Sequence, residues 1–304
     1  MTTADVDPNR LAAPPPFQSV STARRAKNLT ATVLVTLCFL VAVAPLVWVL
    51  WSVVANGLQS LLRPEWWSHS LSGLSPRDDR GGAYHAIYGT LAQGLITTVL
   101  SVPVGVMVGV YLVEYGARSW LARLTTFMVD ILTGVPSIVA ALFVYALWIT
   151  ILGFQRSSFA VSLALLLLMV PVVVRVTEQM LRIVPDELRE ASYALGITKW
   201  KTIVKIVIPT ALSGIVTGVM LGMARVMGET APALVLGLYA QYIQFNVFDG
   251  PMANLPLLIN NQFQNPLQAG FNRTWGAALT LILIIMLFNL AATIVSRLWA
   301  VKKK

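Results

Sequence analysis

The chain alternates between long apolar stretches and short polar connections. A span needs about 20 mostly apolar residues, because a transmembrane helix rises about 1.5 Å per residue. Six stretches meet this length, at about 31–55, 86–113, 126–152, 157–175, 206–227 and 275–297. Helices of this kind satisfy their own backbone hydrogen bonds in lipid. The pattern predicts an all-α integral membrane protein with about six transmembrane helices.

Composition agrees with one membrane domain. Of the 304 residues, 57% are hydrophobic and 12% are charged. Residues 1–28 are polar and contain three consecutive prolines, so we expect a mostly disordered leader there. The first apolar run is too long for the core of a cleavable signal peptide. We expect a transmembrane domain over 29–300 and a short basic tail over 301–304.

Basic residues are concentrated in alternate connections, and this predicts the orientation. The leader, the tail and the connections 114–124 and 176–205 carry most of the lysines and arginines. The opposite side carries Arg63, Arg77, Arg80, Arg156 and Arg273. By the positive-inside rule, the richer side and both termini are cytoplasmic. The net charge of +9 therefore reflects topology, and it requires no nucleic-acid partner.

The cytoplasmic connection 176–205 contains the segment PDELREASYALG. Pro185 and Asp186 favour a helix start, and Gly196 favours a helix end. The resulting helix is too short and too charged to span a bilayer. Its small residues would let the surface of another protein approach the backbone closely. The alternative is a solvated helix that only joins two spans.

Charged side chains inside the spans are the main candidates for a functional site, because they are costly in lipid. Arg225 and Glu229 are four residues apart, which on a continuous helix allows an ion pair. The planar fork of arginine suits an oxyanion such as phosphate or sulfate. Gly228 and Pro232 indicate a helix break, where backbone N–H groups can also receive an anion. A purely structural ion pair is the alternative.

Two further charges lie near the predicted cytoplasmic ends of spans. Arg175 ends the fourth span, where it could contact a substrate or extend to the interface. Arg175 and Arg225 are expected at different depths, as successive contacts along a path. Asp130 is expected to be a helix-end charge or the partner of a basic residue. The run Gly134–Ser137 can kink the third span.

The outer connections show less specific signals. Trp66 and Trp67 suit an interfacial belt, and MANLPLLINNQ suggests either a short amphipathic helix or a packed loop. His69 and His85 lie without clustered ligands, so we expect surface histidines and no metal site. The single cysteine, Cys38, permits no intrachain disulfide. The chain contains no G-x-x-x-x-G-K-[ST] segment, so ATP would have to bind to another subunit.

The cytoplasmic segment resembles the EAA signature of ABC-importer permeases, EAA-x3-G-x9-I-x-L-P. Glu190, Ala191 and Ser192 are followed by Gly196 and, nine residues later, by Ile206 to Pro209. Ser192 and Ile208 depart from the pattern, both mildly in size. The resemblance implies that this helix docks on an ATP-binding subunit through Glu190, Ala191, Ser192 and Gly196.

Longer segments narrow the resemblance. LTGVPSIVAALFV, the stretch from Pro171 to Ile203, and ARVMGETAPALV are similar to permease subunits of bacterial phosphate importers. This implies that Arg175, Arg225 and Glu229 contact phosphate in a bacterial plasma membrane. It also implies a second homologous permease subunit, a pair of ATP-binding subunits and an extracytoplasmic phosphate-binding protein as partners. The rival readings are a permease for sulfate or molybdate, an anion channel and a membrane-embedded enzyme.

Overall fold

The computed structural model describes residues 21–116 and 119–299, and every regular element in that part of the chain is helical. The chain divides into two units, Met1–Ser52 and Val53–Lys304. Helix α1, Thr22–Leu61, contains the boundary between them. Residues 22–28 of the expected leader are helical, while residues 1–20 lie outside the described part of the chain. The exposed side chains of α1 up to Ser52 are mostly apolar, as suits a helix surrounded by lipid.

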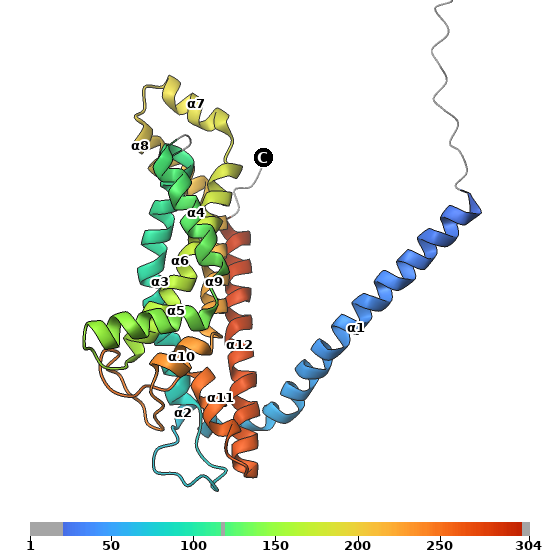
Figure 1. Cartoon of the computed structure of the whole chain (residues 1–304), viewed down its shortest axis with the longest axis vertical. Coiled ribbons are helices and arrows are strands. Elements are labelled where there is room, and N and C mark those ends of the chain that lie inside the picture. The colour runs from blue at the N-terminus through green and yellow to red at the C-terminus, as the bar shows by residue number, and fades with distance from the viewer. Residues whose placement is uncertain (1–20, 117–118, 300–304) are drawn as a thin grey trace, which may run out of the picture. The chain divides into compact units, whose positions relative to one another are not determined.

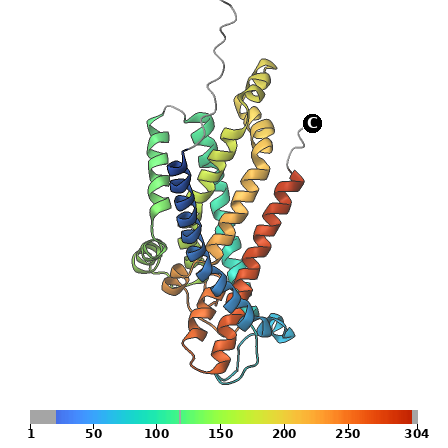
Figure 2. The same ribbon diagram turned by 90° about the vertical axis from the view of Figure 1, so that its right-hand side faces the viewer.

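The second unit is a bundle built around four long helices (Figures 1 and 2). Helix α6 packs on both α3 and α9, and α9 packs on α12. The π-helical turn η1 extends α3, while α8 and η3 lead into α9. The bounds are α3 Tyr84–Val110, η1 Tyr111–Tyr115, α6 Ser158–Ile183, α8 Lys199–Thr202, η3 Ile203–Val207, α9 Ile208–Met227 and α12 Gln268–Trp299.

Two glycines allow α3 to lie very close to α6. A Cβ atom on Gly105 would lie 2.6 Å from Val173 Cγ1, and one on Gly109 would lie 2.7 Å from Thr177 Cβ. Small residues of this kind are typical of helix contacts in membranes, because lipid provides little hydrophobic force to bring helices together. The α3–α6 pair is therefore the tightly packed centre of the bundle.

The third predicted span is broken rather than continuous. Helix α4, Trp120–Gly134, is followed by α5, Ser137–Val144, and the π-helical η2, Tyr145–Ile151, at an angle of 106°. The break falls at Val135 and Pro136, within the run that predicted a kink. Five helices in the described residues are long and apolar enough to cross a membrane, and six if the bent pair counts as one span.

Short helices lie toward the two ends of this unit (Figure 1). Helix α7, Asp186–Ala194, lies at one end, and α2, Pro64–Ser68, and α11, Leu255–Phe263, lie toward the other. The MANLPLLINNQ segment forms α11, which buries its leucines against the bundle and packs on α12 and α3. A further short helix, α10 Ala231–Leu236, follows α9.

The outer connection before α3 is tied to α12. The Trp66 ring is buried and its Nε1 donates to Thr280 Oγ1 at 2.9 Å, so Trp66 packs inside the protein and not at the expected interface. Trp67 is exposed, and its interfacial position stays a prediction. His85 is also buried, because α3 begins at Tyr84 and takes this residue into its packed first turn. The prediction of a surface histidine is thus wrong for His85, whereas His69 is exposed.

Ion pairing holds the tip of the same connection. Arg63 Nη2 donates to Asp79 Oδ2 at 2.7 Å, and Asn272 Nδ2 donates to Asp79 Oδ1 at 3.1 Å. Burial raises the pKa of Asp79, but these hydrogen bonds and the charges of Arg63 and Arg273 outweigh it. The pKa of this carboxyl therefore lies below its ordinary value.

Candidate functional site

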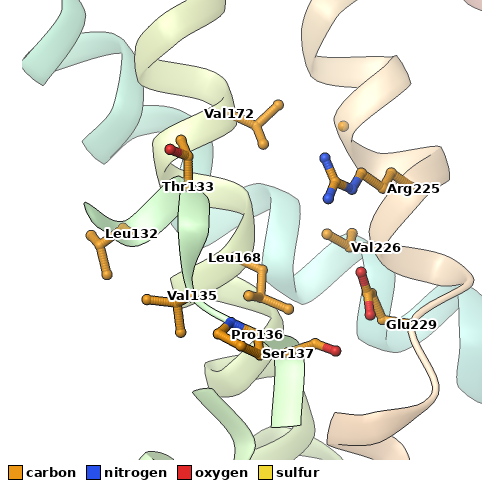
Figure 3. Close-up of a pocket in the computed structure, with 11 residues that line it drawn as sticks. Leu132, Thr133, Val135, Pro136, Ser137, Leu168, Val172, Arg225, Val226 and Glu229 are labelled. Atoms are coloured by element: carbon orange, nitrogen blue, oxygen red, sulfur yellow. The ribbon is translucent and has the colours of Figure 1, made fainter. Parts of the chain in front are cut away.

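A cavity of about 270 Å³ lies where the α4–α5 break faces α6 and the end of α9 (Figure 3). Both charged residues of the ARVMGET segment, Arg225 and Glu229, line it. The other lining residues come from α4, α5, α6, α9 and the α4–α5 break, and they are mostly apolar. They are Leu132, Thr133, Val135, Pro136, Ser137, Leu168, Val172, Gly222 and Val226.

Arg225 lies in the last turn of α9 and is exposed in this chain. Its guanidinium extends across the cavity toward the side where Thr133 and Val172 lie (Figure 3). Among the described residues, no side chain forms a salt bridge or hydrogen bond with it. An arginine inside a span with its donors unused is suited to bind an anion.

The predicted ion pair between Arg225 and Glu229 is not formed. Helix α9 ends at Met227, and the amides of Gly228 and Glu229 turn back to the carbonyls of Arg225 and Val226 at 3.1 and 3.2 Å. Glu229 therefore does not lie one turn further along the same helix. These two amides are already bonded, so neither is free to receive an anion. Anion binding by other N–H groups near this break stays a prediction.

The α4–α5 break brings backbone donors to the cavity instead. Ser137 is the first residue of α5, and the first amides of a helix have no intrahelical acceptor. The positive end of the helix dipole also favours a nearby anion. Figure 3 shows the Ser137 hydroxyl directed toward the side of the cavity where Glu229 lies. The cavity thus combines one guanidinium, one carboxylate, the hydroxyls of Thr133 and Ser137, and a helix N-terminus.

Arg175 belongs to a separate network of charges. Its Nη1 donates to Glu178 Oε2 at 2.7 Å, and its Nη2 donates to Asp130 Oδ1 on α4. Arg182 Nη2 donates to the second oxygen of Glu178 at 2.6 Å. Asp130 is thus the partner of a basic residue, as one of the two alternatives predicted. Helix α6 continues to Ile183, so Arg175 does not end its span and pairs with carboxylates instead of extending to the interface.

The residues of this network lie next to the cavity-lining residues of α4 and α6, on the side of the bundle where α7 lies. Leu168, Val172 and Arg175 are spaced by four and three residues on α6, which places them on one helix face. Asp130 and Thr133 are similarly spaced on α4. Arg175 does not itself line the cavity. Arg175 therefore lies outside the cavity that Arg225 lines, and successive contacts of the two arginines along a path stay a prediction. Glu178 is a member of the network that the sequence analysis missed.

Helix α7 has the predicted start and end. It runs from Asp186 to Ala194, with Pro185 before it. Gly196 has φ +76°, its amide donates to Tyr193 O at 2.9 Å, and the amide of Ile197 donates to Ser192 O at 3.2 Å. This is the Schellman arrangement, which favours glycine at the left-handed position.

The exposed face of α7 contains only part of the predicted coupling set. Glu190, Ala191 and Gly196 are exposed. Ser192 is buried, and its hydroxyl is 2.8 Å from that of Thr202 on α8. Ser192 therefore faces its own chain, because α8 folds back against α7. No group of three or more His, Cys, Asp or Glu in the described residues is arranged to hold a metal ion.

A bundle of membrane helices with a broken helix beside a cavity lined by Arg225 and Glu229 is typical of membrane transport subunits. The fold is similar to that of a chain of the MetNI methionine ABC transporter in an inward-facing conformation. The TM-score is 0.56 at 21% identity, over 72% of this chain and 94% of that one. A chain of an amino acid ABC transporter is similar as well, with a TM-score of 0.56 at 16% identity, over 70% of this chain and 91% of that one.

Sequence comparison gives the family. Residues 101–301 match the model described as binding-protein-dependent transport system inner membrane component, and the chain belongs to this family. Phosphate transport system permease protein PstA 1 of Mycobacterium tuberculosis (strain ATCC 25618 / H37Rv) is 58% identical over 279 residues, which cover 92% of this chain and 90% of that protein. PstA of Mycobacterium leprae (strain TN) is 59% identical over 274 residues, 90% of each chain. PstA of Yersinia pestis is 40% identical over 277 residues, also 90% of each.

Proposed function

We propose that this chain is the transmembrane permease subunit of an ATP-driven importer of inorganic phosphate. Its place is the bacterial plasma membrane, with both termini and α7 on the cytoplasmic side. The observation that carries the proposal is the guanidinium of Arg225, which lines the cavity without a side-chain partner among the described residues. The family and the names of its PstA relatives support phosphate as the substrate.

The cavity offers phosphate complementary groups. Arg225 can donate two parallel hydrogen bonds to two phosphate oxygens, and the backbone N–H groups at the N-terminus of α5 can donate to a third oxygen. Glu229 accepts hydrogen bonds only, so it can bind the protonated oxygen of hydrogen phosphate. The same carboxylate repels a fully ionised sulfate, which has no proton to donate. Glu229 also weakens the hold on the anion, as transport requires.

Arg175 is proposed as the next contact on the path. It lies toward the cytoplasmic end of the cavity, and its guanidinium is shared between Asp130 and Glu178. Phosphate would leave Arg225 and compete with these carboxylates for Arg175. Successive weak contacts of this kind allow movement, because an anion held equally tightly in every state would not be driven through.

Helix α7 is proposed to dock on the ATP-binding subunit through the exposed Glu190, Ala191 and Gly196. On the buried side of this helix, the hydroxyl of Ser192 contacts that of Thr202 on α8 and supports the position of α7. ATP is bound and hydrolysed in a pair of those partner subunits, with no cofactor in this chain. A second, homologous permease subunit completes the path beside Arg225. An extracytoplasmic phosphate-binding protein delivers phosphate to the outer connections.

The test is ATP-driven uptake of radiolabelled phosphate by the complete complex in proteoliposomes. Arg225→Gln should reduce uptake at least about tenfold, because a charged hydrogen bond contributes about 1.5–3 kcal/mol. Arg24→Gln removes an equal charge at the exposed start of α1 and should leave uptake unchanged. Uptake of sulfate or molybdate in place of phosphate would assign another oxyanion. Phosphate flux without ATP would indicate a channel, and normal uptake by Arg225→Gln would remove Arg225 from the path.

A further inference from the structure

Helix α7 is fastened to the end of α3 by a buried ion pair. Arg189, in the middle of α7, donates from Nη2 and Nε to Glu114 Oε1 at 2.9 and 3.2 Å. Glu114 belongs to η1, the π-helical turn that ends α3. The side chains of Arg189 and Glu114 are only 12% and 5% exposed. A buried pair of this kind is costly to break, because removing one partner leaves an uncompensated buried charge.

Arg189 also binds the end of α6. Its Nη1 donates to Val184 O at 2.7 Å, and its Nη2 donates to Leu181 O at 3.0 Å. The two carbonyls lie at the C-terminus of α6, and Leu181 O also accepts from the amide of Val184 at 3.3 Å. One guanidinium therefore joins α7, the last turn of α6 and the end of α3.

Glu114 is the meeting point of the whole cytoplasmic connection. Its side chain binds Arg189, and its backbone carbonyl accepts a hydrogen bond from Lys199 Nζ of α8. The same ammonium group lies 4.7 Å from the centre of the Tyr115 ring. Helix α7, through Arg189, and helix α8, through Lys199, are thus both attached to the segment 114–115. A displacement of α7 cannot leave η1 where it is without breaking these contacts.

Helix α3 in turn packs on α9 and α6, two of the helices that line the cavity. At Gly94 it lies so close to α9 that a Cβ atom would be 2.5 Å from Met227 Cε. Met227 is two residues from Arg225 in the last turn of α9. Gly105 and Gly109 hold α3 equally closely to α6, which carries Val172 of the cavity wall. A continuous set of close contacts therefore joins α7 to the residues that line the cavity.

We propose that the Glu114–Arg189 pair is the joint through which movement of α7 is transmitted to α3 and so to the cavity. Both residues act as positioning residues, and neither contacts the transported anion. The inference rests on the proposed function, because it assumes that an ATP-binding subunit moves α7. A purely structural clamp is the rival explanation for the same contacts.

The experiment measures the number of ATP molecules hydrolysed per phosphate transported by the assembled complex in proteoliposomes. Glu114→Gln and Arg189→Gln should raise this ratio at least about tenfold in complexes of normal composition. The double exchange Glu114→Arg with Arg189→Glu should restore part of the coupling. The matched control is Asp186→Asn, since Asp186 also pairs with Arg189 at 3.1 Å but is 87% exposed. Its ratio should remain within about twofold of the unmodified complex.

A structural clamp predicts a different result. Loss of stability would lower ATP hydrolysis and transport together, with an unchanged ratio in the complexes that assemble, and that outcome would overturn the proposal. If either glutamine variant prevents assembly, Arg189→Lys takes its place, because it keeps the positive charge but removes the planar guanidinium. An unchanged ratio of ATP hydrolysed to phosphate transported in Arg189→Lys would equally overturn the proposal. The unmodified complex separates the two hypotheses. If it fails to import phosphate, the proposed function is wrong, whatever the variants do.

Discussion

Arg175 on α6 is ion-paired with Asp130 on α4, although 45 residues separate them in the chain. The same guanidinium binds Glu178, so it is shared between carboxylates of two helices. An anion can bind Arg175 only in competition with these carboxylates. The arrangement ties α4 to α6, and on the proposed path it would limit how tightly Arg175 holds an anion.

Replacing Glu178 should destabilise the protein more than replacing Asp130. Glu178 is 9% exposed and pairs with Arg175 and Arg182, so Glu178→Gln should cost about 2 kcal/mol, below the roughly 3–5 kcal/mol of a fully buried pair. Asp130 is 59% exposed, so Asp130→Asn should cost less than about 1 kcal/mol. Thermal unfolding of the purified complex measures both. A larger effect at Asp130 would contradict this ranking.

A methyl group added at Gly109 should separate α3 from α6. The added Cβ would lie 2.7 Å from Thr177 Cβ, and overpacking of this kind costs about 1–3 kcal/mol. The unfolding temperature of Gly109→Ala should therefore fall by several degrees. Gly134→Ala is the control, because nothing lies within 4 Å of the corresponding Cβ position. Equal unfolding temperatures for the two variants would show that the close approach is relaxed at little cost.

The end of α7 should depend on backbone conformation at Gly196 rather than on space. A Cβ atom there would meet nothing within 4 Å, but φ is +76°. Gly196→Val should therefore loosen the turn at a cost of about 1–2 kcal/mol, while Gly196→Asn should be tolerated better. Limited proteolysis of the 186–202 segment, together with phosphate uptake, compares the two. Indistinguishable variants would mean that the left-handed turn is not needed.

The outer connection should lose stability in acid. The pKa of Asp79 is lower in the folded protein than in the unfolded chain, where it is about 3.9, so the ionised form favours folding. This contribution is complete above about pH 4 and disappears as the pH falls through the folded-state pKa. Unfolding temperatures at pH 5 and pH 3 should therefore differ more for the unmodified protein than for Asp79→Asn. The same difference in both proteins would argue against a role for the Arg63–Asp79 pair.

The number and order of the spans could be predicted from the sequence, because in lipid the length of an apolar run is nearly sufficient to define a helix. Their ends could not. Helix α6 extends eight residues beyond Arg175, since Glu178 pairs with both Arg175 and Arg182 and so keeps the charges within the helix. The spacing of these three residues is visible in the sequence. The contact of their helix face with α4 depends on tertiary packing and is not.

The candidate site was predicted by residue type and not by geometry. Arg225 and Glu229 do line one cavity, yet the expected pair requires a helix that continues past Gly228. Ser192 stands at the third position of the family signature, where it departs from the pattern, and it faces α8 because the turn at Gly196 folds the chain back on itself. Contacts between distant segments, such as Glu114 with Arg189, leave no local pattern and require the fold.

The exposed guanidinium of Arg225 also affects the fate of copies of this chain that remain unassembled. An unassembled copy would present this cation to hydrocarbon, at a penalty of about 2.5–3.5 kcal/mol. Unassembled copies should therefore be cleared by membrane proteases, and a pulse-chase measurement should show a shorter half-life when the proposed second permease subunit is missing. Balanced production of the two chains would then follow from a single arginine.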